Sequence, residues 1–288
     1  MIFIQFSYKL YFFLFICKYK IKSLIMKTNF VYLLLIGIFI SSCSSSDDSS
    51  DGASATSLFP LTNGNYWTYD VDAQIDGRDS LYVKGDTLIS SLTYKKMKTK
   101  QIASGFFSNS LRNNGVRING SLVQLTGGLS FDLGLTTPLN FAVQDFVILK
   151  KNAVQNEVLS TVTGSFNQTI GDYPMTFDYT VKSISDGNVA TFTSNGKTYT
   201  DIQKTKVVVS LKVSTTTTIP GTTFPLTVVV LNQQDVVTST QYYANTIGMV
   251  YADTNITYQL NSLPNITLPI PESGNQNIKE YLDTYLAN

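Results

Sequence analysis

The chain has 288 residues, of which 43% are hydrophobic and 14% charged, with 21 basic and 20 acidic side chains. It contains no histidine and two cysteines. It therefore lacks the commonest general base and the commonest transition-metal ligand of proteins, and we expect no metal site and no cofactor.

A basic residue, an apolar run and two small residues precede Cys43. Lys27 is followed by the apolar run 30–40 and then by Ser41 and Ser42. This order is typical of a secretory signal peptide. The run of eleven residues is shorter than the roughly 20 that a membrane-spanning helix needs. We therefore expect residues 1–42 to be a signal peptide.

The position of Cys43 directly after these small residues resembles the lipobox of bacterial lipoproteins. Ile40 stands where leucine is usual and Ser42 where glycine or alanine is usual, and both are mild changes in size. The resemblance implies lipidation at Cys43. Its thiol receives a diacylglycerol, the residue becomes the new N-terminus, and acyl chains such as palmitate anchor it in a membrane.

The residues before Met26 need a separate explanation, because they contain a second apolar run over 10–17. They form either an extended basic leader or part of two spanning segments, or else translation starts at Met26. We favour the start at Met26, since Met26 and Lys27 begin a complete signal peptide unaided.

The residues after Cys43 form a short acidic run. Residues 44–51 are all serine or aspartate, which resembles the surface-export signal of lipoproteins in the Bacteroidetes lineage. The resemblance implies an outer-membrane protein that is lipid-anchored and surface-exposed, with a flexible tether over 43–57. A plain disordered tether is the alternative, because such a run cannot bury apolar surface.

Removal of residues 1–42 changes the charge of the chain. It takes away five lysines and no acid, which leaves 16 basic and 20 acidic side chains and a net charge near −4. We therefore expect no nucleic-acid partner, because nucleic acid requires a basic face. Cys43 is the one cysteine left, so no disulfide is expected and stability must come from an ordinary core.

Residues 58–262 are predicted to form one all-β domain, a single curved antiparallel sheet or a partly open barrel or sandwich. Asn-Gly and Asp-Gly pairs, which supply the positive φ angles of tight hairpins, recur at 63–64, 76–77, 114–115, 119–120, 186–187 and 195–196. Between them, residues alternate between apolar and polar, as in Val207, Val209, Leu211 and Val213. One buried and one wet face is typical of an antiparallel sheet.

Strands are predicted throughout this domain. A strand around Trp67 has Trp67 and Tyr69 on its buried side, and we expect Trp67 to be a structural anchor rather than a ligand-stacking residue. Further strands are expected over 80–90, 92–103, 115–118, 121–125, 141–150, 156–169, 176–184, 189–194, 207–214, 225–231, 236–243, 246–251 and 255–260.

The start and end of this domain carry a second resemblance. Residues 59–69 contain Pro60-Leu61, Gly64-Asn65, Trp67 and Tyr69 in the spacing PLxxGNxWxY, and 242–250 end in a strand similar to GIGxV. Both patterns resemble uncharacterised Bacteroidetes lipoproteins. The resemblance implies a curved antiparallel sheet and no agreed activity.

One helix is predicted, in a proline-containing tail over 263–288. From Asn275 to Leu286 the apolar residues recur at helical spacing, at Ile278, Tyr281, Leu282, Tyr285 and Leu286. Prolines at 264, 269 and 271 separate this segment from the strands. We expect a short terminal helix, docked on the sheet or loosely attached.

Motifs that carry chemistry are scarce. Asp72–Gly77 resembles a calcium loop, but Gln74 is a poor ligand and Val83 stands where a bidentate glutamate belongs, so a hairpin turn is favoured. The run 95–100 contains four lysines and is predicted to be a solvated strand face, with an acidic glycan or phosphate contact as the alternative. We assign no catalytic residue.

Carboxylates are the remaining groups for acid–base chemistry, and glycoside hydrolysis needs two of them. Aspartates lie mostly in turn contexts here, so we expect acidic side chains to point to solvent and no concave pocket to hold a convergent pair. An enzyme is therefore not expected.

Four functional hypotheses follow in order. The first is a surface-displayed, non-catalytic binding module for a glycan or protein ligand, since the chain has 17 tyrosines. The second is a structural envelope protein. The third is a lipid or apolar-ligand carrier with a half-barrel cavity, and the fourth is a carboxylate-dependent glycan hydrolase. A filled core with an outer aromatic patch favours the binding module, and an empty apolar cavity favours the carrier.

Cys43→Ala is expected to release the full chain from the membrane. Several acyl chains, at about 0.8 kcal/mol for each buried methylene, make the anchor effectively permanent. In Triton X-114 partitioning the wild-type protein should enter the detergent phase and the variant the aqueous phase. Unchanged partitioning of the variant would contradict lipidation at Cys43.

Overall fold

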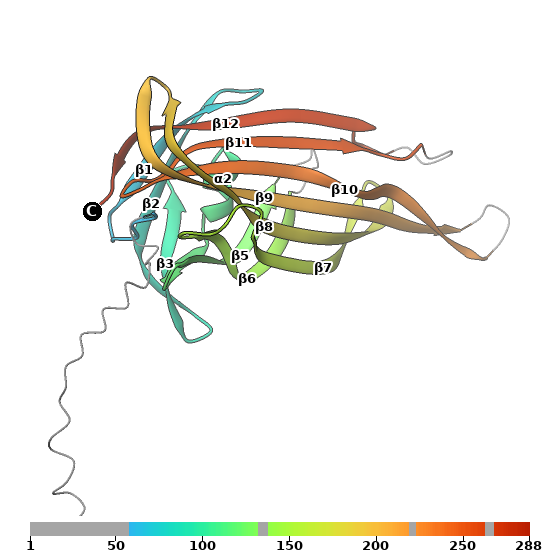
Figure 1. Ribbon diagram of the computed structural model, residues 1–288. Helices are drawn as coiled ribbons and strands as arrows, with labels where there is room; N and C mark the ends of the chain where they lie inside the picture. Colours follow the sequence, from blue (N-terminus) through green and yellow to red (C-terminus); the bar gives the residue numbers. More distant parts are fainter. Residues whose placement is uncertain (1–57, 132–137, 219–222, 263–267) are drawn as a thin grey trace, which may run out of the picture. The chain divides into compact units, whose positions relative to one another are not determined.

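The computed structural model describes residues 58–131, 138–218, 223–262 and 268–288 (Figure 1). These residues form an all-β fold in which a 12-stranded antiparallel sheet rolls into a nearly closed barrel with one unsealed seam. The one α-helix among them is α2 (Phe106–Leu111). No helix in the described part of the chain is long and apolar enough to cross a membrane.

The strands follow one another in chain order with few interruptions. They are β1 (Tyr66–Asp72), β2 (Gly77–Ile89), β3 (Leu92–Thr99), β4 (Gly115–Asn119), β5 (Leu122–Phe131), β6 (Leu139–Lys150), β7 (Val158–Ile170), β8 (Tyr173–Ser194), β9 (Lys197–Thr218), β10 (Pro225–Ala244), β11 (Gly248–Gln259) and β12 (Ser273–Leu286).

The sheet is a meander that runs in two directions from its middle. Its order is β6-β5-β4-β3-β2-β1-β12-β11-β10-β9-β8-β7. The first and last strands are therefore neighbours, and Asp70 of β1 lies opposite Tyr281 of β12. The chain ends in the centre of the sheet, and β6 and β7 form its two edges.

Period-two alternation determines which side chains enter the core. Trp67, Tyr69 and Val71 of β1 are buried while Thr68 and Asp70 face outward. The inward Trp67 is fully buried, stacks on Phe59 at 5.2 Å between ring centroids and donates from Nε1 to the carbonyl of Ile247. This confirms Trp67 as a structural anchor, because its ring and its N–H are both used inside the protein.

Helix α2 fills the inside of the rolled sheet (Figure 1). Its Phe107 is buried and makes edge contacts with Phe59, Tyr69 and Tyr243 at 6.0–6.3 Å between ring centroids. Phe106 and Leu111 are buried as well. The helix therefore occupies space that an apolar ligand would otherwise need.

The two edges of the sheet do not form a ladder across the seam. The second half of β6 lies against the inner side of the opposite strands, and four consecutive residues, 146–149, are buried there on both faces. Buried side chains of β8 and β9 bind the β6 backbone and the loop after it. Ser183 donates to the carbonyl of Val147, and Gln203 donates to the carbonyl of Lys150. Gln203 also accepts from the N–H of Asn152 at 3.2 Å.

The predicted terminal helix is wrong, because Ser273–Leu286 is strand β12. Ile278, Glu280 and Leu282 alternate inward between β1 and β11. The apolar residues fit a helical stripe by coincidence, and a glutamate at a buried position disguised the alternation. The β domain therefore continues beyond 262 to the end of the chain.

Several predicted strands are joined in the structure. The segments 176–184 and 189–194 are one strand, β8, which passes over the Asp186–Gly187 pair by a bulge rather than a turn. Segments 225–231 and 236–243 likewise form β10, and 246–251 and 255–260 lie in β11. The pairs at 119–120 and 195–196 lie where β4–β5 and β8–β9 turn, as predicted.

Gln203→Leu is expected to destabilise the protein by about 2–4 kcal/mol, because the carbonyl of Lys150 and the N–H of Asn152 would both stay buried without a partner. The free energy of unfolding in urea measures this. The matched control is Gln144→Leu on β6, an exposed position at which we expect a change within about 0.5 kcal/mol. Equal effects of the two changes would show that the seam does not depend on Gln203.

Candidate functional site

Two buried carboxylates hold the inner helix. Asp79 of β2 accepts from the N–H groups of Ser104 and Gly105 at 2.9 and 2.8 Å. Glu280 of β12 accepts from the N–H groups of Phe107 and Ser108 at 2.8 and 3.1 Å, and from the Ser108 hydroxyl at 2.8 Å. Our expectation that acidic side chains point to solvent is wrong for these two.

This pair is built into the fold rather than open to a cleft. Glu280 is fully buried and Asp79 is 3% exposed. The nearby pocket, which Gly105 and Phe106 line, contains neither carboxylate among its lining residues. Gly105 is required for the close approach, since a Cβ at this position would lie 2.1 Å from the carboxyl carbon of Glu280. All five hydrogen bonds come from the segment before and within α2, which is typical of a structural capping arrangement.

Burial, followed by the neighbouring charge of Asp79, raises the pKa of Glu280 to about 7. Burial also raises the pKa of Asp79. Hydrogen bonds from α2 oppose both shifts without cancelling them. The cost of two like charges in the interior is therefore lowered by a proton.

The protein should lose stability as the pH rises from 4.5 to 7. In this range folded Glu280 keeps a proton that the unfolded chain, with a pKa of 4.5, has already released, so the free energy of unfolding falls by up to about 3 kcal/mol. Urea unfolding at a series of pH values measures the slope. Glu280→Gln should flatten it.

The matched control for this slope is Glu157→Gln. The pKa of Glu157 is lowered by a hydrogen bond from Lys150, so its titration falls below this pH window. That variant should keep the wild-type slope. A Glu280→Gln variant with the same slope would show that Glu280 does not titrate in this range.

The inner face leaves little space for a ligand. At the ends of β7–β11 an entirely apolar pocket, lined by residues including Met175, Phe177, Leu231 and Tyr258, has a volume of about 30 Å³. This is room for one or two water molecules, whereas ligand pockets usually measure about 300–1,000 Å³.

A row of three tyrosines crosses the outward face of the sheet. Tyr242 of β10 lies opposite Tyr251 of β11, which lies opposite Tyr281 of β12. The ring centroids of successive tyrosines are 5.3 Å apart, and all three side chains are half-buried. We call these residues the tyrosine row. Burial raises the pKa of Tyr251, and its hydroxyl stays protonated.

Charged side chains continue the tyrosine row at both ends. Lys204 of β9 lies opposite Tyr242, with its Nζ 5.8 Å from the ring centroid. At the other end Tyr281 lies opposite Asp70, and Asp70 lies opposite Arg78 of β2. One line across six strands therefore reads lysine, three tyrosines, aspartate and arginine.

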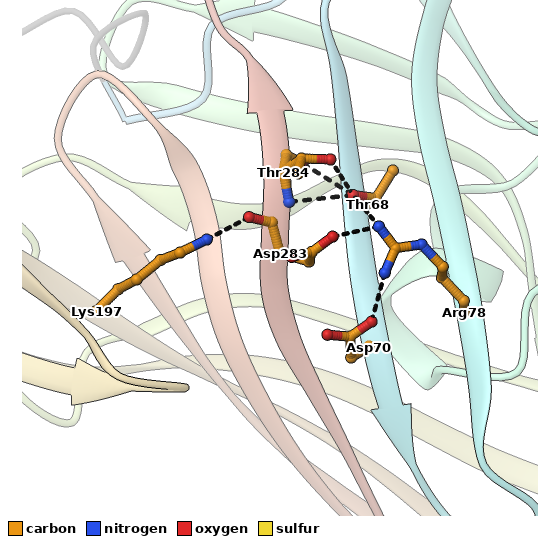
Figure 2. Close-up of polar contacts among 6 residues, drawn as sticks. All are labelled: Thr68, Asp70, Arg78, Lys197, Asp283 and Thr284. Atoms are coloured by element: carbon orange, nitrogen blue, oxygen red, sulfur yellow. Dashed lines mark hydrogen bonds and ion pairs between the residues drawn. The ribbon is translucent and has the colours of Figure 1, made fainter.

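The arginine end is a connected polar cluster (Figure 2). Arg78 donates to Asp70 at 2.7 Å and to Asp283, and these bonds, that to Asp283 first, raise the pKa of Arg78. Thr68 and Thr284 bind one another beside it. Arg78 and Asp70 are about half exposed, at 53% and 46%, so this end of the tyrosine row is open to solvent.

The β8–β9 hairpin covers the other end of the tyrosine row. Phe192 stacks on Tyr242 at 4.4 Å between ring centroids and contacts Tyr251 at 5.3 Å. At the tip of the hairpin Lys197 donates to the carbonyl of Asp283 (Figure 2). The hairpin therefore forms a wall over Tyr242 and leaves Tyr281 and Arg78 uncovered by Phe192.

The other residues considered from the sequence have separate places. The segment 72–77 connects β1 and β2, as the turn interpretation predicted. Lys95 pairs with Asp86, while Lys96 and Lys98 donate to Asn113, so these lysines are engaged on the surface of the β3 region. Cys43 and the lipidation prediction lie outside the described residues.

The tyrosine row was not predicted as a site. Each tyrosine lies at an outward position of its strand, but the sequence holds no sign of which strands become neighbours or in what register. Comparisons with family models, curated proteins and solved structures found no match. The function is therefore inferred from this chain's own residues.

Proposed function

We propose that the protein is a non-catalytic binding module, anchored in the outer membrane by lipid at Cys43 and displayed on the cell surface, that holds a glycan chain on the tyrosine row. The observation that carries the proposal is the unbroken register of Tyr242, Tyr251 and Tyr281 on the outward face. Such a platform offers flat apolar faces with hydroxyls at their edges.

The chemistry of the tyrosine row suits a sugar polymer. Strands lie about 4.8 Å apart, so three successive rings extend over about 10 Å, which is about two sugar rings. Pyranose faces are apolar and stack on aromatic rings, while their hydroxyls need polar partners. Asp70 and Arg78, at the open end, supply an acceptor and donors beside Tyr281.

The interior supports this proposal over the carrier and the hydrolase. The apolar pocket of about 30 Å³ is too small for a lipid. The buried carboxylates Asp79 and Glu280 accept hydrogen bonds from backbone amides around α2, and this engages the oxygens that a glycosidase would need free. The outward face is therefore the better-supported ligand surface.

Tyr281→Ala should weaken binding of the full chain to soluble polysaccharides by roughly tenfold, as expected when one stacking tyrosine is lost. Affinity electrophoresis through gels that contain a neutral or an acidic polysaccharide measures the retardation. Tyr82→Ala is the matched control, because Tyr82 is a half-buried outward tyrosine of β2 outside the tyrosine row, and its retardation should stay within twofold of wild type.

Two results would contradict the proposal. One is a wild-type chain that no polysaccharide retards. The other is an equal loss of retardation in the Tyr281 and Tyr82 variants, which would separate binding from the tyrosine row.

A further inference from the structure

Strand β7 has one edge that no described strand covers. On one side it pairs with β8 along its whole length, from Val158 opposite Ile184 to Ile170 opposite Tyr173. On the other side the sheet ends. The strand that could close the barrel, β6, has its second half tucked against β8 and β9 by hydrogen bonds from Ser183 and Gln203. The β7 edge therefore has no ladder partner in one copy of the chain.

This edge lacks the usual protection against pairing. Exposed edge strands are normally blunted by charged side chains, proline or shortness. The thirteen residues of β7 include no charged residue and no proline. Its outward positions from Thr161 to Thr169 are exposed hydroxyl or amide side chains, and its inward positions are half-buried. The strand is thus long, regular and uncharged along its free edge.

We propose that β7 pairs antiparallel with β7 of a second copy of this chain, which gives a two-fold dimer with a continuous sheet. Antiparallel pairing of identical strands is self-complementary about a central residue. With Gly164 on the axis, Val162 meets Phe166, Thr163 meets Ser165 and Thr161 meets Asn167 of the second copy. Apolar positions then face apolar ones, and hydroxyls face hydroxyl or amide groups.

The charges on the neighbouring strand fit this register. Asp178 of β8 lies opposite Ser165, and Lys182 lies opposite Thr161. Across the proposed axis these two rows end at Thr180 and Thr176 of the second copy, because those threonines lie opposite Thr163 and Asn167. No like charges share a row, so the pairing meets no electrostatic penalty of the kind that deters edge association.

The test measures the mass of the full chain by multi-angle light scattering, with the detergent contribution subtracted, and repeats it for Cys43→Ala so that a shared micelle cannot join two copies. Both are expected to be dimers at micromolar concentration. Thr163→Lys with Ser165→Lys brings four ammonium groups around the axis and should raise the dissociation constant at least 100-fold. Thr257→Lys, at an exposed threonine of β11 between two paired strands, is the matched control and should remain dimeric.

Hydrogen exchange gives a second measurement that does not depend on the folding of the lysine variant. In the dimer the β7 amides that point away from β8 should be protected, and protection should fall on dilution. A wild-type chain that stays monomeric at the highest soluble concentration overturns the proposal. So does a folded lysine variant that remains dimeric, or a dimer whose β7 amides exchange freely.

Discussion

The interior of this protein depends on two buried carboxylates that hold a six-residue helix in place. So short a helix is not stable alone, because nucleation costs more than one turn regains. Asp79 and Glu280 come from the two strands that flank β1 and bind the backbone amides around the start of α2. Phe107 then completes an aromatic core with Phe59, Tyr69 and Tyr243. The rolled sheet is therefore filled rather than hollow.

This filling has consequences for both edges of the sheet and for its outer face. Because the inside is occupied, β6 packs against the opposite wall and is held by Ser183 and Gln203 instead of a strand ladder. That leaves β7 without a partner at one edge. It also leaves the outward surface as the place for ligand recognition, where register aligns three tyrosines between Lys204 and Arg78.

Sequence patterns predicted most of the strands, and their failures have physical causes. Alternation identified segments such as Val207–Val213 because one buried and one wet face require period two. It failed at β12, where Glu280 occupies an inward position that an apolar residue usually fills, and Ile278 and Leu282 also fit a helical stripe. It missed α2, which is too short to show a period and depends on Asp79 and Glu280 for its capping.

The sequence by itself determined the all-β class, the outward or inward side of most strand residues and the structural place of Trp67, since these follow from the local alternation of side chains. Only the tertiary structure decided the strand order, the burial of Asp79 with Glu280, the tyrosine row and the uncovered edge of β7. Each of these brings together residues far apart in the chain, such as Tyr242 and Tyr281 or Asp79 and Glu280. Local patterns carry no information about register between distant strands, and the free energy of packing the whole sheet decides it.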